Sequence, residues 1–276
     1  MLALMKSAKF RFPSALTANG WQEDVEVAVD AGGMIAAVTP GSKEGQQVSG
    51  IAVPAVPNVH SHAHQRFMLG LAEKAGPGAD SFWTWREVMY GFALKLGPAD
   101  LEAVAAQLYV EMLKSGFSVV GEFQYLHHQP DGVPYATPAE LSVRSLAAAE
   151  TAGIAMTLLP TLYNHGGFGG QPAIAGQRRF VNDANRYLKI QETLRGAVTG
   201  HPLRRLGLSP HSLRAVTAEL LSEVLAGIDT AAPVHIHVAE QTKEVDDCLA
   251  WCGKRPVDLM LDSFDVSPRW TAIHAT

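Results

Sequence analysis

Short apolar runs that alternate with helical stretches dominate this sequence from Ile51 onward. Continuous apolar runs of this kind are typical of parallel strands buried on both faces, and helical stretches between them are typical of βα units. The runs are Ile51–Val59, Val119–Phe123, Ala155–Leu162, Leu206–Ser209, Val234–Ala239 and Trp270–His274. Six such strands predict a (β/α)-barrel rather than a short open sheet. The sequence has no dinucleotide-binding fingerprint, which disfavours a doubly wound nucleotide-binding fold.

The helical stretches have recognisable ends. Thr137-Pro138-Ala139-Glu140 has the pattern of a capping box with proline at the first helical position, and Gly153 follows the last expected turn. Residues 100–114 place their apolar side chains close to one face, and Gly116 is expected to end that helix. The glycines of residues 166–170 follow the third strand without a P-loop lysine, so we expect a mobile loop there.

Residues 1–50 follow a different pattern. Valine occupies every second position between Asp24 and Asp30, which predicts a half-buried strand. Gly32-Gly33 predicts a turn and Met34–Val38 a second strand, so this segment is expected to form a hairpin. It is too short for a core of its own. We therefore expect residues 1–50 to be part of a small β-sandwich-like domain, and residues 51–276 to form the barrel.

Composition limits the partners of this chain. The 276 residues carry a net charge of −5, with a pI near 6.1. This charge gives no basic stripe for nucleic acid and no attraction to an anionic membrane, so a small substrate is expected. No apolar run approaches the roughly 18 residues of a membrane helix, and Met1–Lys6 lacks the features of a signal peptide. A cytoplasmic protein is expected, with Cys248 and Cys252 as reduced thiols on one helical face.

Ionisable and polar side chains follow nearly all of the apolar runs. In a barrel, the carboxyl ends of the strands form the face that carries the active site. In chain order, these residues are His60, His62, His64, Glu122, Tyr163, Asn164, His165, His211, His237, Glu240 and His274. Eleven histidines distributed at random would not follow apolar runs so regularly.

His60-Ser61-His62 is the sharpest of these signals. Residues i and i+2 of a strand point to the same side, so both imidazoles can reach one metal ion at roughly 2.0–2.1 Å. Alone, the pair is equally compatible with two hydrogen-bonded histidines at a strand end. His237, in the fifth run beside His235, supplies a third ligand. Three ligands and a water molecule are typical of a catalytic zinc site rather than a closed structural one.

Two further residues fit the chemistry of a metal-activated water. Such water has a pKa of about 7, and hydrolysis then needs a group that carries its proton to the leaving nitrogen. Glu240 follows His237 by three residues and is a candidate for that role, although a glutamate at a strand end is often only an exposed helix-capping residue. His274 is a candidate for holding the water or polarising the attacked carbon's substituent.

These motifs resemble the amidohydrolase superfamily of metal-dependent barrels. The matching residues are Pro57–His62, His237 and His274. Within that superfamily the chain is similar to the formimidoylglutamate deiminases of histidine degradation. The segments that carry this second resemblance are His60–Arg66, Ser81–Arg86, Gly121–His128, Ser209–Arg214 and His235–Gln241.

The resemblance implies a role for each site residue. It implies one divalent ion, Zn²⁺ for preference, with His60, His62 and His237 as ligands. It implies Glu240 as the proton donor to the departing nitrogen and His274 as the residue that positions the water. The substrate-binding residues that it implies are Gln65, Arg86, Tyr125, His211 and Arg214. Two arginines suit a small dianionic substrate, because a guanidinium binds a carboxylate through two parallel hydrogen bonds.

The implied reaction is hydrolysis of N-formimidoyl-L-glutamate to N-formyl-L-glutamate and ammonia. Two alternatives remain open at this point: another aminohydrolase of the superfamily, acting on a purine or a related amine, and a metal-binding chain without activity. Iron and manganese remain alternatives to zinc, since imidazole suits several metals. A homodimer is compatible with the resemblance, and the oligomeric state is open.

One departure from the family concerns the end of the chain. The resemblance implies two more strands and an aspartate that ligates the metal and acts as general base, whereas this sequence ends at His274-Ala275-Thr276. We therefore expect an incomplete, C-terminally truncated barrel, with two exposed sheet edges and little activity of its own. Turnover comparable to that of a full-length relative would contradict this expectation.

Overall fold

The computed structural model describes residues 6–71 and 82–276, which form two compact units. One unit comprises residues 1–56 and the other residues 57–276. Ser81 and the first five residues, on which part of the sequence analysis depends, lie outside the described residues. Within the part of the chain that is described, no helix is long and apolar enough to cross a membrane.

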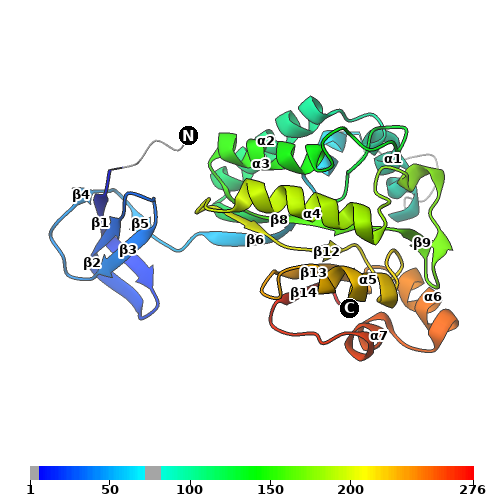
Figure 1. Ribbon diagram of the computed structural model, residues 1–276. Coiled ribbons are helices and arrows are strands. Elements are labelled where there is room, and N and C mark those ends of the chain that lie inside the picture. Colours follow the sequence, from blue (N-terminus) through cyan, green and yellow to red (C-terminus); the bar gives the residue numbers. More distant parts are fainter. Residues whose placement is uncertain (1–5, 72–81) are drawn as a thin grey trace. The chain divides into compact units, whose positions relative to one another are not determined.

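The first unit is a five-stranded sheet (Figure 1). Its strands are β1 (Ala8–Thr17), β2 (Gly20–Val29), β3 (Ile35–Thr39), β4 (Gln46–Gln47) and β5 (Ile51–Ala52). The predicted hairpin is confirmed, because β2 pairs antiparallel with β3 and Val27 lies opposite Val38. β1, which the sequence analysis did not predict, lies between β2 and β4. The assignment of this unit to a sandwich-like domain stays a prediction.

The second unit contains the long apolar strands and the helices that connect them. Its strands are β6 (Val56–Ser61), β7 (Phe117–Gln124), β8 (Ala155–Leu162), β9 (His165–Gly167), β10 (Gln171–Pro172), β11 (Arg204–Leu206), β12 (Ser209–Pro210), β13 (Val234–Val238) and β14 (Trp270–His274). Its α-helices are α1 (Phe82–Ala93), α2 (Pro98–Lys114), α3 (Glu140–Ala152), α4 (Ala184–Val198), α5 (Ala218–Ala226), α6 (Thr242–Cys252) and α7 (Pro256–Ser263). Two 3₁₀ turns, η1 (Ala63–Met68) and η2 (Ala175–Gln177), complete it.

The strand order follows the chain, as the six apolar runs predict. β6, β7 and β8 are neighbours in that order, and both β11 and β12 pair in parallel with β8. β13 and β14 form a parallel pair, which isolated parallel bridges at Leu208–Val234 and Ser212–His237 connect to the β12 region. Figure 1 shows α2, α3 and α4 lying along the outside of these strands, where α2 contacts β7, α3 contacts β8 and α4 contacts β11.

Burial explains why these segments form central strands. The last five residues of β7 and of β8 and all five of β13 are buried, as expected for strands covered on both faces. Gly121 allows β6 and β7 to approach closely, because a Cβ atom there would lie 2.7 Å from the carbonyl oxygen of Val59. The close approach occurs one residue before His60.

Three local predictions differ from the structure. The run Ile51–Val59 is divided between β5 and β6, because Pro54 interrupts it and proline has no N–H for a ladder. The capping box at residues 137–140 is absent: Pro138 belongs to a turn closed by the Glu140 N–H and the Thr137 carbonyl, and α3 begins only at Glu140. The glycine segment is a short β9–β10 hairpin, not an irregular loop.

Candidate metal centre

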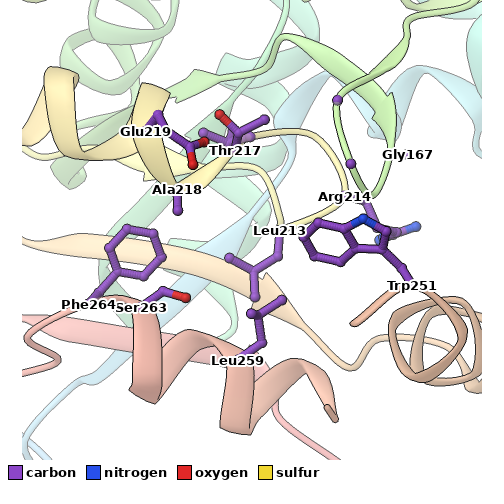
Figure 2. Close-up of a pocket in the computed structure, with 13 residues that line it drawn as sticks. Gly167, Leu213, Arg214, Thr217, Ala218, Glu219, Trp251, Leu259, Ser263 and Phe264 are labelled. Carbon is purple, nitrogen blue, oxygen red and sulfur yellow. The ribbon is translucent and has the colours of Figure 1, made fainter. Parts of the chain in front are cut away.

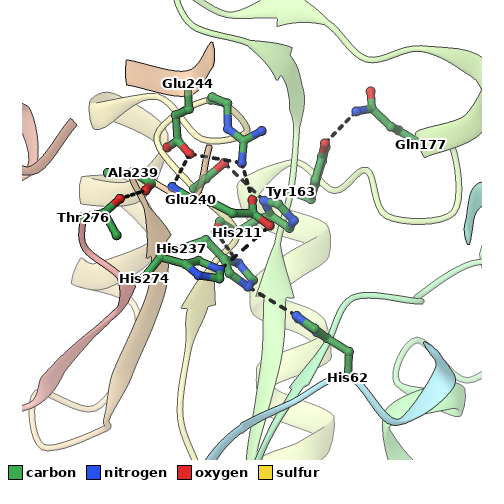
Figure 3. A network of polar contacts seen from close by, with 12 residues as sticks. His62, Tyr163, Gln177, His211, His237, Ala239, Glu240, Glu244, His274 and Thr276 are labelled. Carbon is green, nitrogen blue, oxygen red and sulfur yellow. Dashed lines mark hydrogen bonds and ion pairs between the residues drawn. The ribbon is translucent and has the colours of Figure 1, made fainter. Parts of the chain in front are cut away.

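Three histidines from two distant strands converge at one point of the second unit. His60 lies in β6, His62 directly follows that strand, and His237 lies in β13. The Nε2 atom of His237 is 3.1 Å from Nε2 of His60 and 3.3 Å from Nε2 of His62. One ligand atom from each residue lies within 4.8 Å of the others. Figure 3 shows the rings of His62 and His237 facing each other across the space between the strands.

Backbone carbonyls fix the orientation of two of these rings. The Nδ1 atom of His62 donates to the Phe123 carbonyl at 3.0 Å, and Nδ1 of His237 donates to the His211 carbonyl, also at 3.0 Å. A carbonyl oxygen only accepts, so each neutral ring carries its proton on Nδ1 and its lone pair on Nε2. Such hydrogen bonds are typical of histidines that bind metals.

Burial also keeps the three rings neutral. Burial first, and then neighbouring histidines, lower the pKa of His60 and His62 to about 3. The same causes lower the pKa of His237 well below its usual value. Converging lone pairs repel one another unless a cation lies between them. Ligands at roughly 2.05 Å from a tetrahedral zinc would lie about 3.3 Å apart, so the observed distances fit such an ion.

A network of charged groups lies beside the histidines (Figure 3). Glu240 follows β13, and its Oε2 atom accepts a hydrogen bond of 2.9 Å from Nη2 of Arg214. The same arginine nitrogen lies 3.4 Å from Oε2 of Glu244 in α6. His274, at the end of β14, stacks on the His237 ring at 5.6 Å, and its Nε2 atom is 3.8 Å from Oε1 of Glu240. Both predicted catalytic residues therefore lie next to the histidine cluster.

One cavity connects the histidines with the residues that the resemblance implied for substrate binding. It is lined by His62, Gln65, Trp85, Arg86, Met89, Tyr90, Tyr125, Tyr163, Phe180, His211, Arg214, His237 and Glu240. All five predicted substrate-binding residues belong to this lining, and so do two of the three predicted metal ligands. His60, the third predicted ligand, and His274 both contact His237 but do not line the cavity. The individual roles of these residues stay predictions.

Elements from several parts of the unit hold the substrate-binding candidates. Gln65, in η1, donates from Nε2 to the Tyr125 hydroxyl at 3.0 Å. Burial raises the pKa of Tyr125 far above its usual value, so this phenol remains protonated. Arg86, in α1, lies over the Tyr90 ring, with 5.6 Å between the guanidinium carbon and the ring centroid. His211 follows β12 and is kept neutral by burial, which lowers its pKa well below the usual value.

The cavity also contains residues that the sequence analysis did not assign. Tyr163 follows β8, and its hydroxyl accepts a hydrogen bond of 2.7 Å from Nε2 of the buried Gln177. The same amide donates to the Tyr90 hydroxyl at 3.2 Å. Tyr163 is one of the polar residues that follow an apolar run, so position alone identifies it as a candidate. Nothing in the sequence around Gln177 indicates this contact.

A second cavity lies on the other side of Arg214 (Figure 2). Figure 2 shows the apolar side chains of Leu213, Leu259 and Phe264 along one part of its wall and Trp251 near the arginine. Arg214 thus lines both cavities, and only 14% of its side chain is exposed. An apolar boundary of this kind lowers the local dielectric constant and strengthens the pairing of Arg214 with its carboxylates.

The two cysteines are free thiols on one face of α6, as predicted, with their sulfur atoms 3.9 Å apart. The groups of potential metal ligands found among the described residues do not include these cysteines.

Comparison with known protein families gives two matches. Residues 51–267 match the amidohydrolase family, and residues 13–46 match the N-terminal domain of the formimidoylglutamate deiminase HutF. The chain is 50% identical to the formimidoylglutamate deiminase of Pseudomonas aeruginosa over 266 residues, which are 95% of this chain and 58% of that enzyme. It is 25% identical to a 5-methylthioadenosine/S-adenosylhomocysteine deaminase of Desulfovibrio desulfuricans over 75% of this chain and 40% of that enzyme.

Solved structures also resemble this chain in fold. An amidohydrolase from Brucella melitensis superposes with a TM-score of 0.93 at 50% identity, over 98% of this chain and 60% of that one. Atrazine chlorohydrolase from Arthrobacter aurescens, solved with zinc, superposes with a TM-score of 0.76 at 21% identity, over 97% and 60% of the two chains. These superpositions confirm the predicted barrel class. The chain spans about three-fifths of the length of the relatives that share half of its residues.

Proposed function

Because this chain belongs to the amidohydrolase family, we propose that its cavity is the site of a metal-dependent deimination of N-formimidoyl-L-glutamate to N-formyl-L-glutamate and ammonia. One observation carries this proposal: a single cavity combines two histidines of the converging cluster, the carboxylate of Glu240 and the guanidinium groups of Arg86 and Arg214. The resemblance to the deiminase of P. aeruginosa, at 50% identity, supports the choice of substrate.

The histidine cluster is proposed to hold one zinc ion. When bound by His60, His62 and His237, such an ion would supply a water nucleophile with a pKa of about 7. The neutral state of the three rings and the direction of the lone pairs of His62 and His237 support this assignment. The zinc complex of the A. aurescens relative supports zinc rather than another divalent ion.

The residues of this chain provide the remaining steps. Glu240 lies beside the cluster and is proposed to take the proton of the attacking water and deliver it to the departing nitrogen. His274 stacks on His237 and approaches Glu240, so it is proposed to orient the attacking water. The leaving group is ammonia, and the formyl oxygen of the product comes from the water.

The dianionic glutamate part of the substrate is proposed to bind the two arginines. Arg86 and Arg214 line the cavity from different elements, α1 and the loop after β12. Two separated guanidinium groups can bind two separated carboxylates, whereas a neutral purine would leave them unmatched. Gln65, Tyr125 and His211 are proposed to complete the contacts with the substrate.

Ammonia release from N-formimidoyl-L-glutamate by the zinc-loaded chain tests the proposal. We expect slow release, in keeping with the little activity expected of this chain, that depends on metal and is lost in His237→Ala. Guanine and 5-methylthioadenosine are the comparison substrates, since relatives at 25% identity include a deaminase of the latter. Equal turnover of either comparison substrate would contradict the proposed specificity. Binding of the product N-formyl-L-glutamate, measured by calorimetry, tests the dianion site independently of turnover.

A further inference from the structure

We propose that Glu244 is a positioning residue that holds both Glu240 and Arg214 in place for the reaction. This inference rests on the proposed function, which assigns proton transfer to Glu240 and carboxylate binding to Arg214. Glu244 lies outside the cavity lining, in the first turn of α6. Its carboxylate reaches back toward Glu240, which follows β13 (Figure 3), and toward the guanidinium of Arg214, which belongs to the loop after β12.

The first contact of Glu244 fixes the backbone of Glu240. Oε2 of Glu244 accepts a hydrogen bond of 3.0 Å from the Glu240 N–H. The preceding residue, Ala239, has a φ of +54°, in the left-handed region that an alanine rarely adopts. This turn directs Glu240 toward the histidines at the end of a strand. The hydrogen bond to Glu244 stabilises the turn, because it satisfies the N–H that the turn takes out of the strand ladder.

The second contact of Glu244 concerns Arg214. Nη2 of Arg214 lies 2.9 Å from Oε2 of Glu240 and 3.4 Å from Oε2 of Glu244. The arginine is thus held between two carboxylates. During the proposed reaction, Glu240 accepts a proton and a substrate carboxylate approaches Arg214. Glu244 keeps the guanidinium in position through this step, because it takes no part in the proton transfer.

Burial makes Glu244 well suited to this role. Only 1% of its side chain is exposed, so water does not compete for the two contacts. A buried carboxylate that bonds a backbone N–H and an arginine is held rigidly, because moving it would leave a charge unpaired. A helix-capping role is the structural alternative. In that role Glu244 would stabilise α6 without affecting how the cavity binds a dianion.

Two substitutions at Glu244 separate these roles. Glu244→Gln keeps an acceptor for the Glu240 N–H and removes the charge beside Arg214, whereas Glu244→Ala removes both contacts. Asp247→Asn is the matched control, because Asp247 lies one turn further along α6 in an exposed pair with Lys243. Each variant is compared with the unaltered chain after zinc loading, and zinc content is measured to verify that the metal centre is intact.

The first measurement is the affinity for N-formyl-L-glutamate by calorimetry. We expect Kd to rise about 5-fold in Glu244→Gln and 10-fold or more in Glu244→Ala, with no change in Asp247→Asn. The direction of the change in Kd distinguishes positioning from a purely electrostatic effect. If Glu244 acted only through its charge, its removal would strengthen the field of Arg214 and lower Kd for a dianion. A lower or an unchanged Kd in both variants would overturn the proposal.

The second measurement does not depend on the proposed function. Amide hydrogen exchange of Glu240, followed by NMR, reports the hydrogen bond to Glu244 directly. We expect exchange at Glu240 to accelerate at least 10-fold in Glu244→Ala and to stay nearly unchanged in Glu244→Gln, with the Val238 amide as an internal reference. If the unaltered chain neither binds the product nor releases ammonia, the proposed function fails. Unchanged Glu240 exchange in Glu244→Ala would refute the positioning role in either case.

Discussion

At the scale of single residues, metal binding depends on where the lone pairs of three imidazoles point. His237 contacts both other histidines, at 3.1 and 3.3 Å, so it is the residue that connects β6 with β13 at the site. We expect His237→Ala to lower zinc content from one equivalent to less than about 0.1, because two imidazoles bind the ion far more weakly than three. Elemental analysis after dialysis measures this content.

His165→Ala is the matched control for that loss. His165 also follows an apolar strand of the barrel, but it belongs to the β9–β10 hairpin and not to the histidine cluster. Zinc content should therefore stay at one equivalent in this variant. Equal loss of zinc from both variants would show that the ion binds elsewhere.

Glu122 gives the molecule a distinctive dependence of stability on pH. It is buried in β7, and burial raises its pKa to about 7, against a smaller opposing effect of the hydrogen bond from the Ala63 N–H and of the nearby Ser61 and Tyr109 hydroxyls. The folded protein thus binds this proton more tightly than the unfolded chain, in which the pKa is about 4.5. The contribution of this proton to the free energy of unfolding is therefore fully present below pH 4.5. It is lost as the pH rises through 7, and the total loss is roughly 3 kcal/mol.

Comparison with Glu122→Gln isolates this effect. The buried histidines impose the opposite slope, since they are neutral in the fold and become protonated on unfolding below pH 6.5. We therefore expect the free energy of unfolding of the wild type, relative to Glu122→Gln, to fall between pH 5 and pH 8. Urea titrations of the metal-free proteins measure it, because a bound cation nearby would favour the carboxylate. A pH-independent difference would show that Glu122 is ionised throughout this range.

The residues of the site differ in how visible they are in the sequence. His60, His62, His237 and Glu240 could be identified because strand periodicity and barrel topology place strand-end side chains at one face. Glu244 could not, because its contact depends on a left-handed Ala239, and no alanine signals that conformation. Side chains that act through a backbone turn are hidden from any pattern of residue types.

At the scale of elements, the side chain of a buried arginine connects the end of α1 with the segment around His128 through hydrogen bonds. Arg179 is completely buried and donates to the carbonyls of His128 and Leu96 at 2.7 and 2.9 Å, and to that of Ala93. The Ala93 carbonyl belongs to the end of α1 and the Leu96 carbonyl to the turn after it. The last carbonyls of an α-helix have no hydrogen-bond partners within the helix. Because α1 carries Arg86, this anchor also fixes one side of the cavity.

We expect Arg179→Met to lower the free energy of unfolding by about 3 kcal/mol, because buried carbonyls would lose their donors. Arg178→Met is the neighbouring control, since Arg178 is more exposed and its side chain donates to the Pro130 and Ala175 carbonyls. Its effect should stay below about 1 kcal/mol. Urea titration measures both. Equal losses from the two variants would mean that Arg179 contributes no more than a surface arginine.

Element ends were less predictable than element types. The apolar runs located β7, β8 and β13 correctly, because burial on both faces leaves a strong compositional signal, whereas the runs Ile51–Val59 and Leu206–Ser209 are each divided between two strands. The predicted start of α3 was wrong, because the Thr137–Glu140 pattern also suits a tight turn, and the structure has a turn there. The glycines after β8 allow a positive φ, and Gly169 and Gly170 use it to close a hairpin rather than to loosen a loop.

At the scale of the whole molecule, the two units differ in what they contain. Among the residues that the structure describes, the three clusters of buried apolar side chains all lie between Ala63 and Met260, within the second unit. Every residue of the site cavity also belongs to that unit. The sequence analysis predicted a division after residue 50, since alternating valines and continuous apolar runs have different periods, and the domain assignment itself stays a prediction. The two compact units meet between residues 56 and 57.

The metal centre should therefore persist without the first unit. We expect a chain that begins at Pro54, and so retains β6 completely, to bind one equivalent of zinc with a Kd within about 3-fold of the full chain. Competition with a chromophoric chelator measures this affinity, and circular dichroism verifies that the shortened chain is folded. The matched comparison is the same shortened chain with His62→Ala, which should lose zinc as the full-length variant does. A folded shortened chain that fails to bind zinc would show that residues before Pro54 are needed to form the histidine cluster, although none of them contributes a ligand.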